Sequence, residues 1–561
     1  MNTRNIGVLF AAGAGILLAQ ERTYAQSTIR VSVDSNGAEA DATSYSVGGF
    51  SADARFVVFS SMASNLVPND SNGLSDVFVL DRSTGQVECV SVTPDGVPGD
   101  LGSDSFGAIS PDGRFVAFSS EASNLVADDS GMSRDIFVRD RQNGTTERVS
   151  HDPDGHEAHG YSAWPSMTPD GRYVAYWSDA DNLVPGVPDG RIHVYVYDRT
   201  NGVTERVSVD DAGNPGNDDS LYPALSDDGR IVVFESFATN LVPGDTNGWY
   251  DVFAYDRLTH TIERVNVDAQ GAQVNGGHAP SISADGRTVA FCSFANDLVA
   301  GDTNGCWDVF VKDRATGAVE RVSVASGGAE VFDDSFNYKD GLSADGSRVA
   351  FMSRASTLVP SDYNGVQDAF VHDRATGATE LVSRATTGRI GDGASDIAAI
   401  SRDGAWVEFL SASDNLVPGD TNAVLDVFVR QLGPVAAAWS NYGDGFPGTA
   451  GVPTFVASEN PVLGTDLTLA LGNASSLYTV GALVIGLEPA HLESSWVGEL
   501  VVLPAVTRLV GISPWGATLN GSVPADASFG GLEFDLQVLE LDPGAAKGVS
   551  FTQGLALVLG H

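Results

Sequence analysis

The repeated run Asp-x-Asn-Gly-x-x-Asp is the pattern in this sequence that most directly predicts chemistry. It places two carboxylates and one side-chain amide around a glycine turn, and calcium is bound in proteins by oxygen ligands of these kinds. The pattern makes the residues of its four complete copies candidate calcium ligands. These copies are Asp70/Asn72/Asp76, Asp245/Asn247/Asp251, Asp302/Asn304/Asp308 and Asp362/Asn364/Asp368.

The pattern departs from known calcium loops, and a second interpretation stays open. The seventh copy, Asp420/Asn422/Asp426, lacks the glycine, the second copy is shifted by one residue, and the third has His193 in place of the last aspartate. An EF-hand loop would also need a downstream glutamate, and Pro243 stands where an integrin-type loop would have another acidic residue. In the second interpretation, the Asp and Asn side chains form Asx-type turns that accept backbone N–H groups and hold the start of the next strand.

A histidine-rich loop is a second candidate metal site. His151, His156 and His159 lie close together, with Glu157 between the last two, and imidazoles at such spacing bind zinc or other transition metals. No other copy of the repeat contains this cluster, and a glycine-rich exposed loop does not fix ligand geometry. A solvated loop without metal is the alternative.

Motifs for enzyme chemistry are absent from the sequence. The stretch 433–561 has no Gly-x-Ser-x-Gly elbow, and no phosphate loop or dinucleotide fingerprint follows a strand–helix pattern. We therefore expect a non-enzymatic protein without assigned catalytic residues, and calcium at the repeated loops is the main cofactor candidate. Carboxylates are numerous enough to supply a glycosidase pair, so a secreted carbohydrate-active enzyme, a glycoside hydrolase or lyase, is the alternative.

These loops belong to a sequence repeat of nearly constant length. Its leading aspartate recurs at intervals of 57 to 60 residues, and such regular spacing is the signature of a repeat architecture. The seven copies begin at Asp53, Asp112, Asp170, Asp228, Asp285, Asp345 and Asp403.

Each copy predicts four short strands rather than helices. In the fourth copy the strands are expected at 221–225, 230–236, 251–255 and 263–267, with Asp228-Gly229 as a tight hairpin turn. Seven such sheets can bury both faces by packing around an axis as the blades of a β-propeller. Residues 29–33 copy the strand that the last repeat lacks and are expected to close the ring.

The repeat resembles a known family. Ser/Thr-x-Asp-Gly-Arg, Val-Ala-Phe, Asp-Val-Phe-Val-x-Asp and a Thr-Gly turn, found across 28–432, are similar to the PD40 (WD40-like) repeats of TolB-type propellers. The resemblance implies a propeller and, by analogy, a partner-binding role at the cell envelope. The chain departs from TolB itself, which has six blades after an amino-terminal α/β domain, because here seven repeats follow the leader directly.

The amino end and the charge limit where the protein works and what it contacts. Arg4, the apolar run 6–19 and Thr23-Tyr24-Ala25 predict a signal peptide over 1–25, hence a secreted or periplasmic protein with no membrane span after cleavage. Lys and Arg number 31 against 73 Asp and Glu, a net charge of −42, which repels nucleic acid. The expected partner is a protein or a glycan, and the oligomeric state is open.

The resulting organisation is all-β. A seven-bladed β-propeller over 26–432 is followed by a small β-sandwich accessory domain over 433–561, where Arg and Lys nearly vanish. Connections between strands two and three and between blades are long and share one side, so we expect this acidic long-loop face to bind the partner. Cys292 and Cys306 fall within one blade and are a candidate disulfide, whereas Cys89 is expected to be buried.

Overall fold

A computed structural model describes residues 27–433 except 53, 69, 71, 131–132, 187–188 and 361, together with the strands of the carboxy-terminal region. The predicted signal peptide and the first repeat aspartate, Asp53, lie outside the described residues. Those that are described form strands, turns and loops, with no helix long and apolar enough to cross a membrane.

Seven four-stranded antiparallel sheets account for residues 28–431. The predicted strands of the fourth copy are all present, and the last one begins and ends a few residues earlier than expected. The first four blades comprise β2 (Ser44–Phe50), β3 (Phe56–Ser61), β4 (Asp76–Asp81), β5 (Gln86–Cys89); β6 (Ser103–Ile109), β7 (Phe115–Ser120), β8 (Asp135–Asp140), β9 (Thr145–Arg148); β10 (Ser162–Met167), β11 (Tyr173–Ser178), β12 (His193–Asp198), β13 (Val203–Arg206); and β14 (Ser220–Leu225), β15 (Ile231–Ser236), β16 (Asp251–Asp256), β17 (Thr261–Arg264). The last three comprise β18 (His278–Ile282), β19 (Thr288–Ser293), β20 (Asp308–Asp313), β21 (Val319–Arg321); β22 (Ser335–Phe336), β23 (Arg348–Ser353), β24 (Asp368–Asp373), β25 (Ala378–Leu381); and β26 (Ser395–Ile400), β27 (Trp406–Ser411), β28 (Asp426–Gln431) with β1 (Thr28–Arg30).

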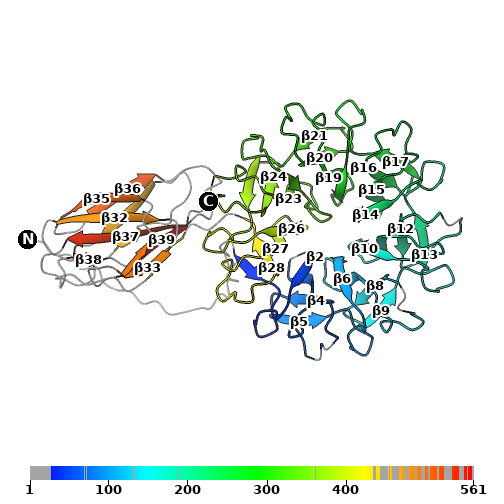
Figure 1. Cartoon of the computed structure of the whole chain (residues 1–561), viewed down its shortest axis with the longest axis horizontal. Coiled ribbons are helices and arrows are strands. Elements are labelled where there is room, and N and C mark those ends of the chain that lie inside the picture. Colours follow the sequence, from blue (N-terminus) through cyan, green and yellow to red (C-terminus); the bar gives the residue numbers. More distant parts are fainter. Residues whose placement is uncertain are drawn as a thin grey trace, which may run out of the picture.

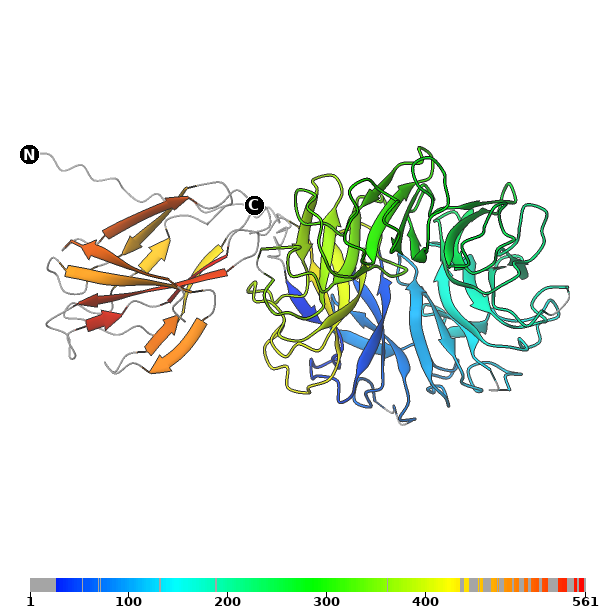
Figure 2. The same ribbon diagram turned by 45° about the horizontal axis from the view of Figure 1, so that its top comes forward.

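The blades form a closed ring, with the first strand of each blade nearest the axis (Figure 1). The ring is closed by β1, which pairs antiparallel with β28 in the register Ile29↔Val429. Ser32 then continues the link, because its hydroxyl and the Asp426 carboxylate are hydrogen-bonded. The turned view in Figure 2 shows the strands running between the two faces of the ring. The chain is therefore an all-β, seven-bladed β-propeller.

A stacked pair of aromatic rings forms the centre of each blade. The rings come from the middle of strands two and three, which the repeat provides as Val-Ala-Phe and Asp-Val-Phe-Val, and their centroids lie 5.6–6.1 Å apart. All of them are buried, so these positions supply the apolar area that holds neighbouring blades together. The pairs are Phe59/Phe78, Phe118/Phe137, Tyr176/Tyr195, Phe234/Phe253, Phe291/Phe310, Phe351/Phe370 and Phe409/Phe428.

The Asp-Gly turn needs glycine for two reasons. Gly113 has a φ of +73°, and a Cβ there would lie 2.2 Å from the ring of Phe56 in the preceding blade. The following arginine, Arg114, forms an ion pair of 2.6 Å with Asp140 at the end of strand three. Arg141, which directly follows Asp140, stacks over Phe56 at 4.4 Å. The Asp-Arg pair at the end of strand three thus supports the turns and the contacts between blades.

The carboxy-terminal region contains three further sheets. One has the order β29-β39-β37-β32-β35 with β38 beside β37, one has the order β30-β31-β36, and β33 pairs with β34. The assembly of these sheets into a sandwich stays a prediction. Their strands are β29 (Ala438–Tyr442), β30 (Phe455–Ala457), β31 (Asp466–Leu471), β32 (Thr479–Gly486), β33 (Pro489–Glu493), β34 (Glu499–Val502), β35 (Val506–Ile512), β36 (Ala517–Ser522), β37 (Glu533–Leu541), β38 (Val549–Phe551) and β39 (Gly554–Val558).

Candidate functional site

In the long loops between strands two and three, the asparagine makes an Asx-type turn. In blade 5 the Asn304 Oδ1 accepts a hydrogen bond from the Cys306 N–H at 2.9 Å, and its Nδ2 donates to Asp308 at 2.7 Å and to the Val331 carbonyl. The same contacts recur at Asn72 and Asn247. Because Nδ2 points at the aspartate, the asparagine offers no oxygen between the two carboxylates.

The asparagine of blade 6 makes the same turn. The Asn364 Oδ1 accepts a hydrogen bond from the Val366 N–H at 3.1 Å, and its Nδ2 donates to the Gly391 carbonyl at 3.0 Å. The sequence pattern makes Asn364 a candidate calcium ligand through this oxygen. The oxygen accepts one backbone N–H in an Asx-type turn and keeps a second lone pair, so the calcium role of Asn364, like that of Asn72, Asn247 and Asn304, stays a prediction.

The last aspartate of each loop connects strand three to strand four. Asp308 is buried and accepts a hydrogen bond from the Ser323 hydroxyl, and Asp76 accepts one from Ser91 at 2.6 Å. Asp368 is held in the same way by Ser383 at 2.6 Å. The four loops thus share one scaffold, which places the two aspartates of each copy near each other.

An arginine from strand four lies between the two aspartates in several blades. In blade 5 the Arg321 Nη1 is 3.0 Å from Asp302, 3.1 Å from Asp308 and 2.9 Å from Glu330. In blade 4 Arg264 lies 3.5 Å from Asp245 and 2.9 Å from Asp251. Blade 7 repeats the arrangement with Arg30, at 3.0 Å from Asp420 and 3.5 Å from Asp426. In these blades a guanidinium already occupies the place where a cation would bind.

Blades 1 and 6 lack this arginine. Cys89 and Leu381 stand at its position in the repeat, and no cationic side chain of the described residues forms an ion pair with the aspartates of these two loops. In blade 6 neither carboxylate oxygen of Asp362 has a hydrogen-bond partner, and the Asp368 Oδ2 has none either. In blade 1 both oxygens of Asp76 are occupied, by Ser91 and by Asn72.

Burial raises the pKa of several of these carboxyl groups. The pKa of Asp76 and of Asp362 is raised to about 6, and that of Asp368 to about 7. Burial also raises the pKa of Asp302 to about 6, although Arg321 opposes the shift. The pKa values of Asp70 and Asp245 are shifted upward for the same reason. Calcium binding by these loops stays a prediction, and the structure divides them into loops with and without a resident arginine.

The histidine-rich loop does not bring its imidazoles together. His151 contacts the Tyr197 hydroxyl at 3.0 Å, His156 contacts Asp152 at 3.2 Å, and His159 contacts Asp181 at 3.2 Å. Two potential ligand sets include residues of this loop. One is Asp152, Asp154 and His156, of which the last two are exposed, and the other joins Glu157 to Asp129 and Asp135 of blade 2.

The three cysteines are free thiols. The candidate disulfide between Cys292 and Cys306 is therefore not formed. Cys89, which we expected to be buried, is only partly so.

A chain of aromatic contacts crosses the long-loop face from blade 3 to blade 6. His278 lies at its centre, with ring centroids 5.8 Å from Tyr222, 6.2 Å from Tyr250 and 6.3 Å from Trp307. The rings are partly exposed, and Trp249 is 49% exposed. We call this set the aromatic patch; it consists of Trp164, Tyr222, Phe237, Trp249, Tyr250, His278, Phe294, Trp307 and Phe336.

A buried glutamate fixes the central histidine. The Glu235 Oε2 lies 2.6 Å from His278 Nδ1 and accepts a hydrogen bond from the Ala279 N–H at 2.9 Å. Glu235 is fully buried, whereas the His278 side chain is 37% exposed. A carboxylate on Nδ1 orients the ring and leaves Nε2 for a ligand.

The backbone is strained where two patch residues enter the ring. Trp164 and Tyr222 have φ values of +57° and +51°, each in a β-bulge directly before a proline. Left-handed backbone at a bulky residue costs about 1–3 kcal/mol and clusters at functional sites. Ala279 has the same conformation at the equivalent position of blade 5, with a φ of +49° directly before a proline, so the bulge recurs in three consecutive blades.

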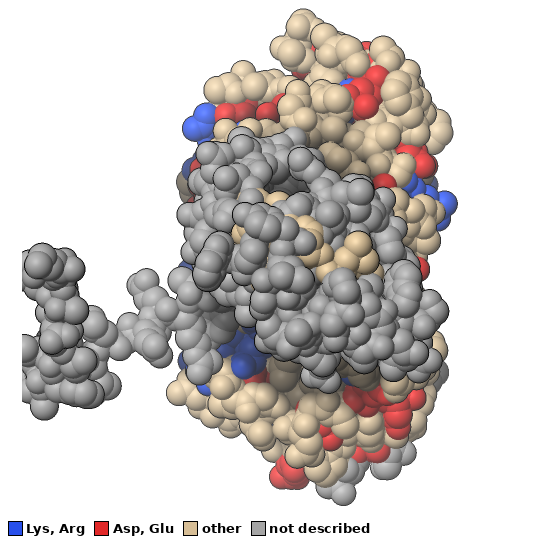
Figure 3. Space-filling view, turned by 90° about the vertical axis from the view of Figure 1, so that its left-hand side faces the viewer, with Lys and Arg blue, Asp and Glu red and all other residues tan. Residues whose placement is uncertain are grey.

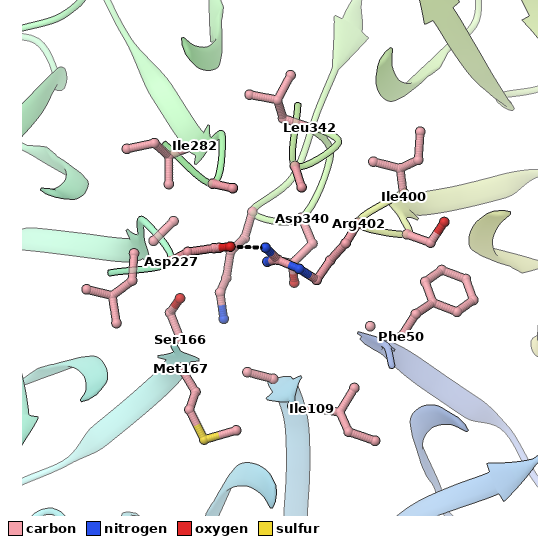
Figure 4. Close-up of a pocket in the computed structure, with 18 residues that line it drawn as sticks. Phe50, Ile109, Ser166, Met167, Asp227, Ile282, Asp340, Leu342, Ile400 and Arg402 are labelled. Carbon is pink, nitrogen blue, oxygen red and sulfur yellow. Dashed lines mark hydrogen bonds and ion pairs between the residues drawn. The ribbon is translucent and has the colours of Figure 1, made fainter. Parts of the chain in front are cut away.

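The central channel holds a cavity of about 110 Å³. One large apolar residue from each blade lines it, beside smaller and polar residues: Phe50, Ile109, Met167, Leu225, Ile282, Leu342 and Ile400. These residues come just before the short turn to strand two of their blades, so the cavity lies at the short-turn end. Arg402 reaches across it to Asp227 (Figure 4). The space at this end comes from the channel and not from the turns, which are short.

Lys339 on the channel wall is buried, whereas Asp227 and Arg402 are each 35% exposed. Lys339 donates to the Pro165 carbonyl on another blade, and Asp340 lines the cavity beside it. Burial raises the pKa of Asp340 and, well above its usual range, that of Glu408. On the described part of the face in Figure 3, Asp and Glu outnumber Lys and Arg, in line with the net charge.

The aromatic patch and the loop arginines are the features that the motif search missed. The patch occupies positions where the copies differ: the residue equivalent to Phe237 is Met62 in blade 1, Glu121 in blade 2 and Ala412 in blade 7. Aligning the seven copies and marking aromatic departures from the repeat would have found it.

No family model and no curated protein sequence matches the chain, and membership of the PD40 repeat family stays a prediction. Among solved structures it is similar to a putative TolB from Agrobacterium tumefaciens, with 18% identity over 50% of this chain and 80% of that one and a TM-score of 0.32. The structure of the RRP9 WD40 repeats shares 10% identity with this chain, over 73% of this chain and 99% of that one, with a TM-score of 0.36. The periplasmic gluconolactonase PpgL from Pseudomonas aeruginosa shares 16% identity with this chain, over 70% of this chain and 95% of that one, with a TM-score of 0.25. We therefore take the fold from the strand pairing itself.

Proposed function

We propose that this chain is an exported, non-enzymatic binding protein that holds a neutral glycan on its long-loop face. The observation that carries this function is the aromatic patch, in which rings from four blades touch in sequence around His278. Aromatic side chains bury much surface at little loss of conformational freedom. Export follows from the predicted signal peptide.

The chemistry of the patch suits a sugar. A pyranose offers a face of C–H groups that packs on an aromatic ring, and its hydroxyls need a few fixed polar partners. Trp249 and Trp307 supply ring faces, and the imidazole of His278 supplies a polar group held by Glu235. The net charge of −42 disfavours anionic ligands.

Binding of the full-length protein to a panel of neutral oligosaccharides and insoluble polysaccharides tests this function. Trp249→Ala and Trp307→Ala should each weaken binding about tenfold, which corresponds to about 1.4 kcal/mol. Phe332→Ala removes another exposed ring, 71% exposed, from an inter-blade loop outside the patch and should leave binding unchanged. Absence of glycan binding, or equal affinity of all three variants and the parent, would sink the proposal; capture of a protein instead would favour a protein partner.

A carbohydrate-active enzyme is the second candidate, and the Glu235–His278 pair favours it. A buried carboxylate that orients a half-exposed imidazole is an arrangement used for general acid–base chemistry. Release of reducing or unsaturated sugar ends from the glycans that bind, lost in His278→Gln but not in Phe332→Ala, would assign this function. Binding without product release supports the binding protein.

A further inference from the structure

The long loop of blade 6 has two buried aspartates and no arginine to neutralise them. In blade 5 two aspartates share one guanidinium, at 3.0 and 3.1 Å. In blade 6 the two equivalent aspartates, Asp362 and Asp368, are present but Leu381 replaces the arginine. Leu381 is 2% exposed and is part of the apolar core, so it cannot supply charge or hydrogen bonds.

Asp362 and Asp368 are left with unused acceptors. Asp362 is 7% exposed and Asp368 is fully buried, and three of their four carboxylate oxygens have no partner at hydrogen-bond geometry. Burial raises the pKa of both groups, and Asn364 opposes the shift only in part, through its backbone N–H at Asp362 and its side-chain amide at Asp368. Buried carboxylates are ordinarily paired or coordinate a metal, because removing their charge from water is costly. The two groups are also coupled, since the charge of Asp362 adds to the effect of burial in raising the pKa of Asp368.

We infer that blade 6 binds a divalent metal cation between Asp362 and Asp368, at the place that the Arg321 guanidinium occupies in blade 5. The unpartnered acceptors of these two side chains are oxygens, which is the preference of calcium. Asp362 can contribute both of its oxygens and Asp368 its Oδ2, while water completes a shell of six to eight ligands. The site does not require Asn364, whose Oδ1 already accepts the Val366 N–H. The neighbouring Tyr363 is 61% exposed, so the loop lies at the surface and water has access.

Other loops of the same chain mark the limits of the inference. Blades 4 and 5 already hold an arginine between their aspartates. Blade 1 also lacks it, but both oxygens of Asp76 accept hydrogen bonds. Of the four predicted calcium loops, the inferred metal site is therefore limited to that of blade 6. It does not depend on the aromatic patch or on the function proposed for that patch.

Calorimetric titration of chelator-treated full-length protein with calcium chloride tests the site. We expect the parent to bind calcium and Leu381→Arg to bind one equivalent fewer, because the new guanidinium takes the place of the metal. Ala375→Arg adds the same charge at an exposed turn of blade 6 and should bind as the parent does. Asp362→Asn is a second variant that should lose the same equivalent.

The thermal midpoint provides a second readout. Since a ligand bound by the folded state alone stabilises it, calcium should raise the midpoint of the parent and of Ala375→Arg, with a smaller rise or none in Leu381→Arg. In chelator, Leu381→Arg should melt above the parent. Absence of calcium binding by the parent, or equal numbers of bound equivalents in the parent, Leu381→Arg and Asp362→Asn, would overturn the inference.

Discussion

Arg402 of blade 7 forms an ion pair with Asp227 of blade 4 across the central channel. Both side chains are 35% exposed, and ion pairs of this exposure contribute about 0.2–1 kcal/mol. The pair is therefore expected to obstruct the channel more than to stabilise the ring. Arg402→Ala should lower the free energy of unfolding by about 0.5 kcal/mol, measured by urea denaturation.

A double-mutant cycle with Asp227→Ala isolates the contribution of this pair. The coupling energy between the two positions should stay below about 1 kcal/mol. A coupling of several kcal/mol would mean instead that the pair is a structural tie between opposite blades.

A charged substitution at Val31, directly after the closing strand β1, should lower the stability of the ring strongly. Val31 is fully buried between blades 7 and 1, and its N–H donates to the Val427 carbonyl at 2.7 Å. Val31→Asp buries an unpaired carboxylate and should lower the unfolding free energy by about 3 kcal/mol or more. Val203→Asp, at a position 57% exposed in β13, is the matched control and should change it by less than about 0.5 kcal/mol. Similar losses in the two variants would contradict a closed ring.

In chelator, the shifted pKa values of the carboxyl groups predict that the folded protein is most stable at mildly acidic pH. The pKa of Asp140 is lowered to about 2 by Arg114, so its stabilising contribution is present above the ordinary value of 3.8 and is lost as the pH falls toward 2. Burial raises the pKa of Asp135 to about 7, so the folded state keeps a proton there that the unfolded chain releases near 3.8. Stability from this group is present below 3.8 and is lost as the pH rises to 7.

Thermal midpoints from about pH 3 to about pH 8 measure this profile. Asp135→Asn, which carries no titratable proton, should make the decline between about pH 4 and about pH 7 shallower, since each unit of pKa difference corresponds to about 1.4 kcal/mol. Asp112→Asn, in an exposed turn, should leave that slope unchanged. An unaltered slope in Asp135→Asn would refute the assignment.

The sequence predicts those features that the repeat itself encodes. Seven copies and the Asp-Gly turns follow from local patterns, and the strands of the fourth copy lie within a few residues of the expected positions. In the sequence, the arginine of strand four is visible only as part of the repeated strand pattern. Its contacts with Asp302 and Asp308 join residues 19 and 13 positions apart and form only in the folded blade. The aromatic patch is not part of the repeat pattern, because its residues stand at positions where the copies differ.

Removing the arginine of blade 5 should create a loop that needs a metal ion for its stability, just as adding an arginine to blade 6 should remove that need. Arg321→Leu gives blade 5 the residue that blade 6 has naturally, and it leaves Asp302 and Asp308 buried without a cation. Removing one partner of a buried ion pair costs about 3–5 kcal/mol, so the unfolding free energy in chelator should fall by this order. Calcium should recover part of the loss, because the carboxylates would then converge on the position vacated by the guanidinium. Arg287→Leu, which removes an arginine 51% exposed and paired with Asp313, should cost less than about 1 kcal/mol and show no recovery in calcium. A stability of Arg321→Leu equal to that of the parent in chelator would show that these carboxylates are neutral in the folded protein and need no cation.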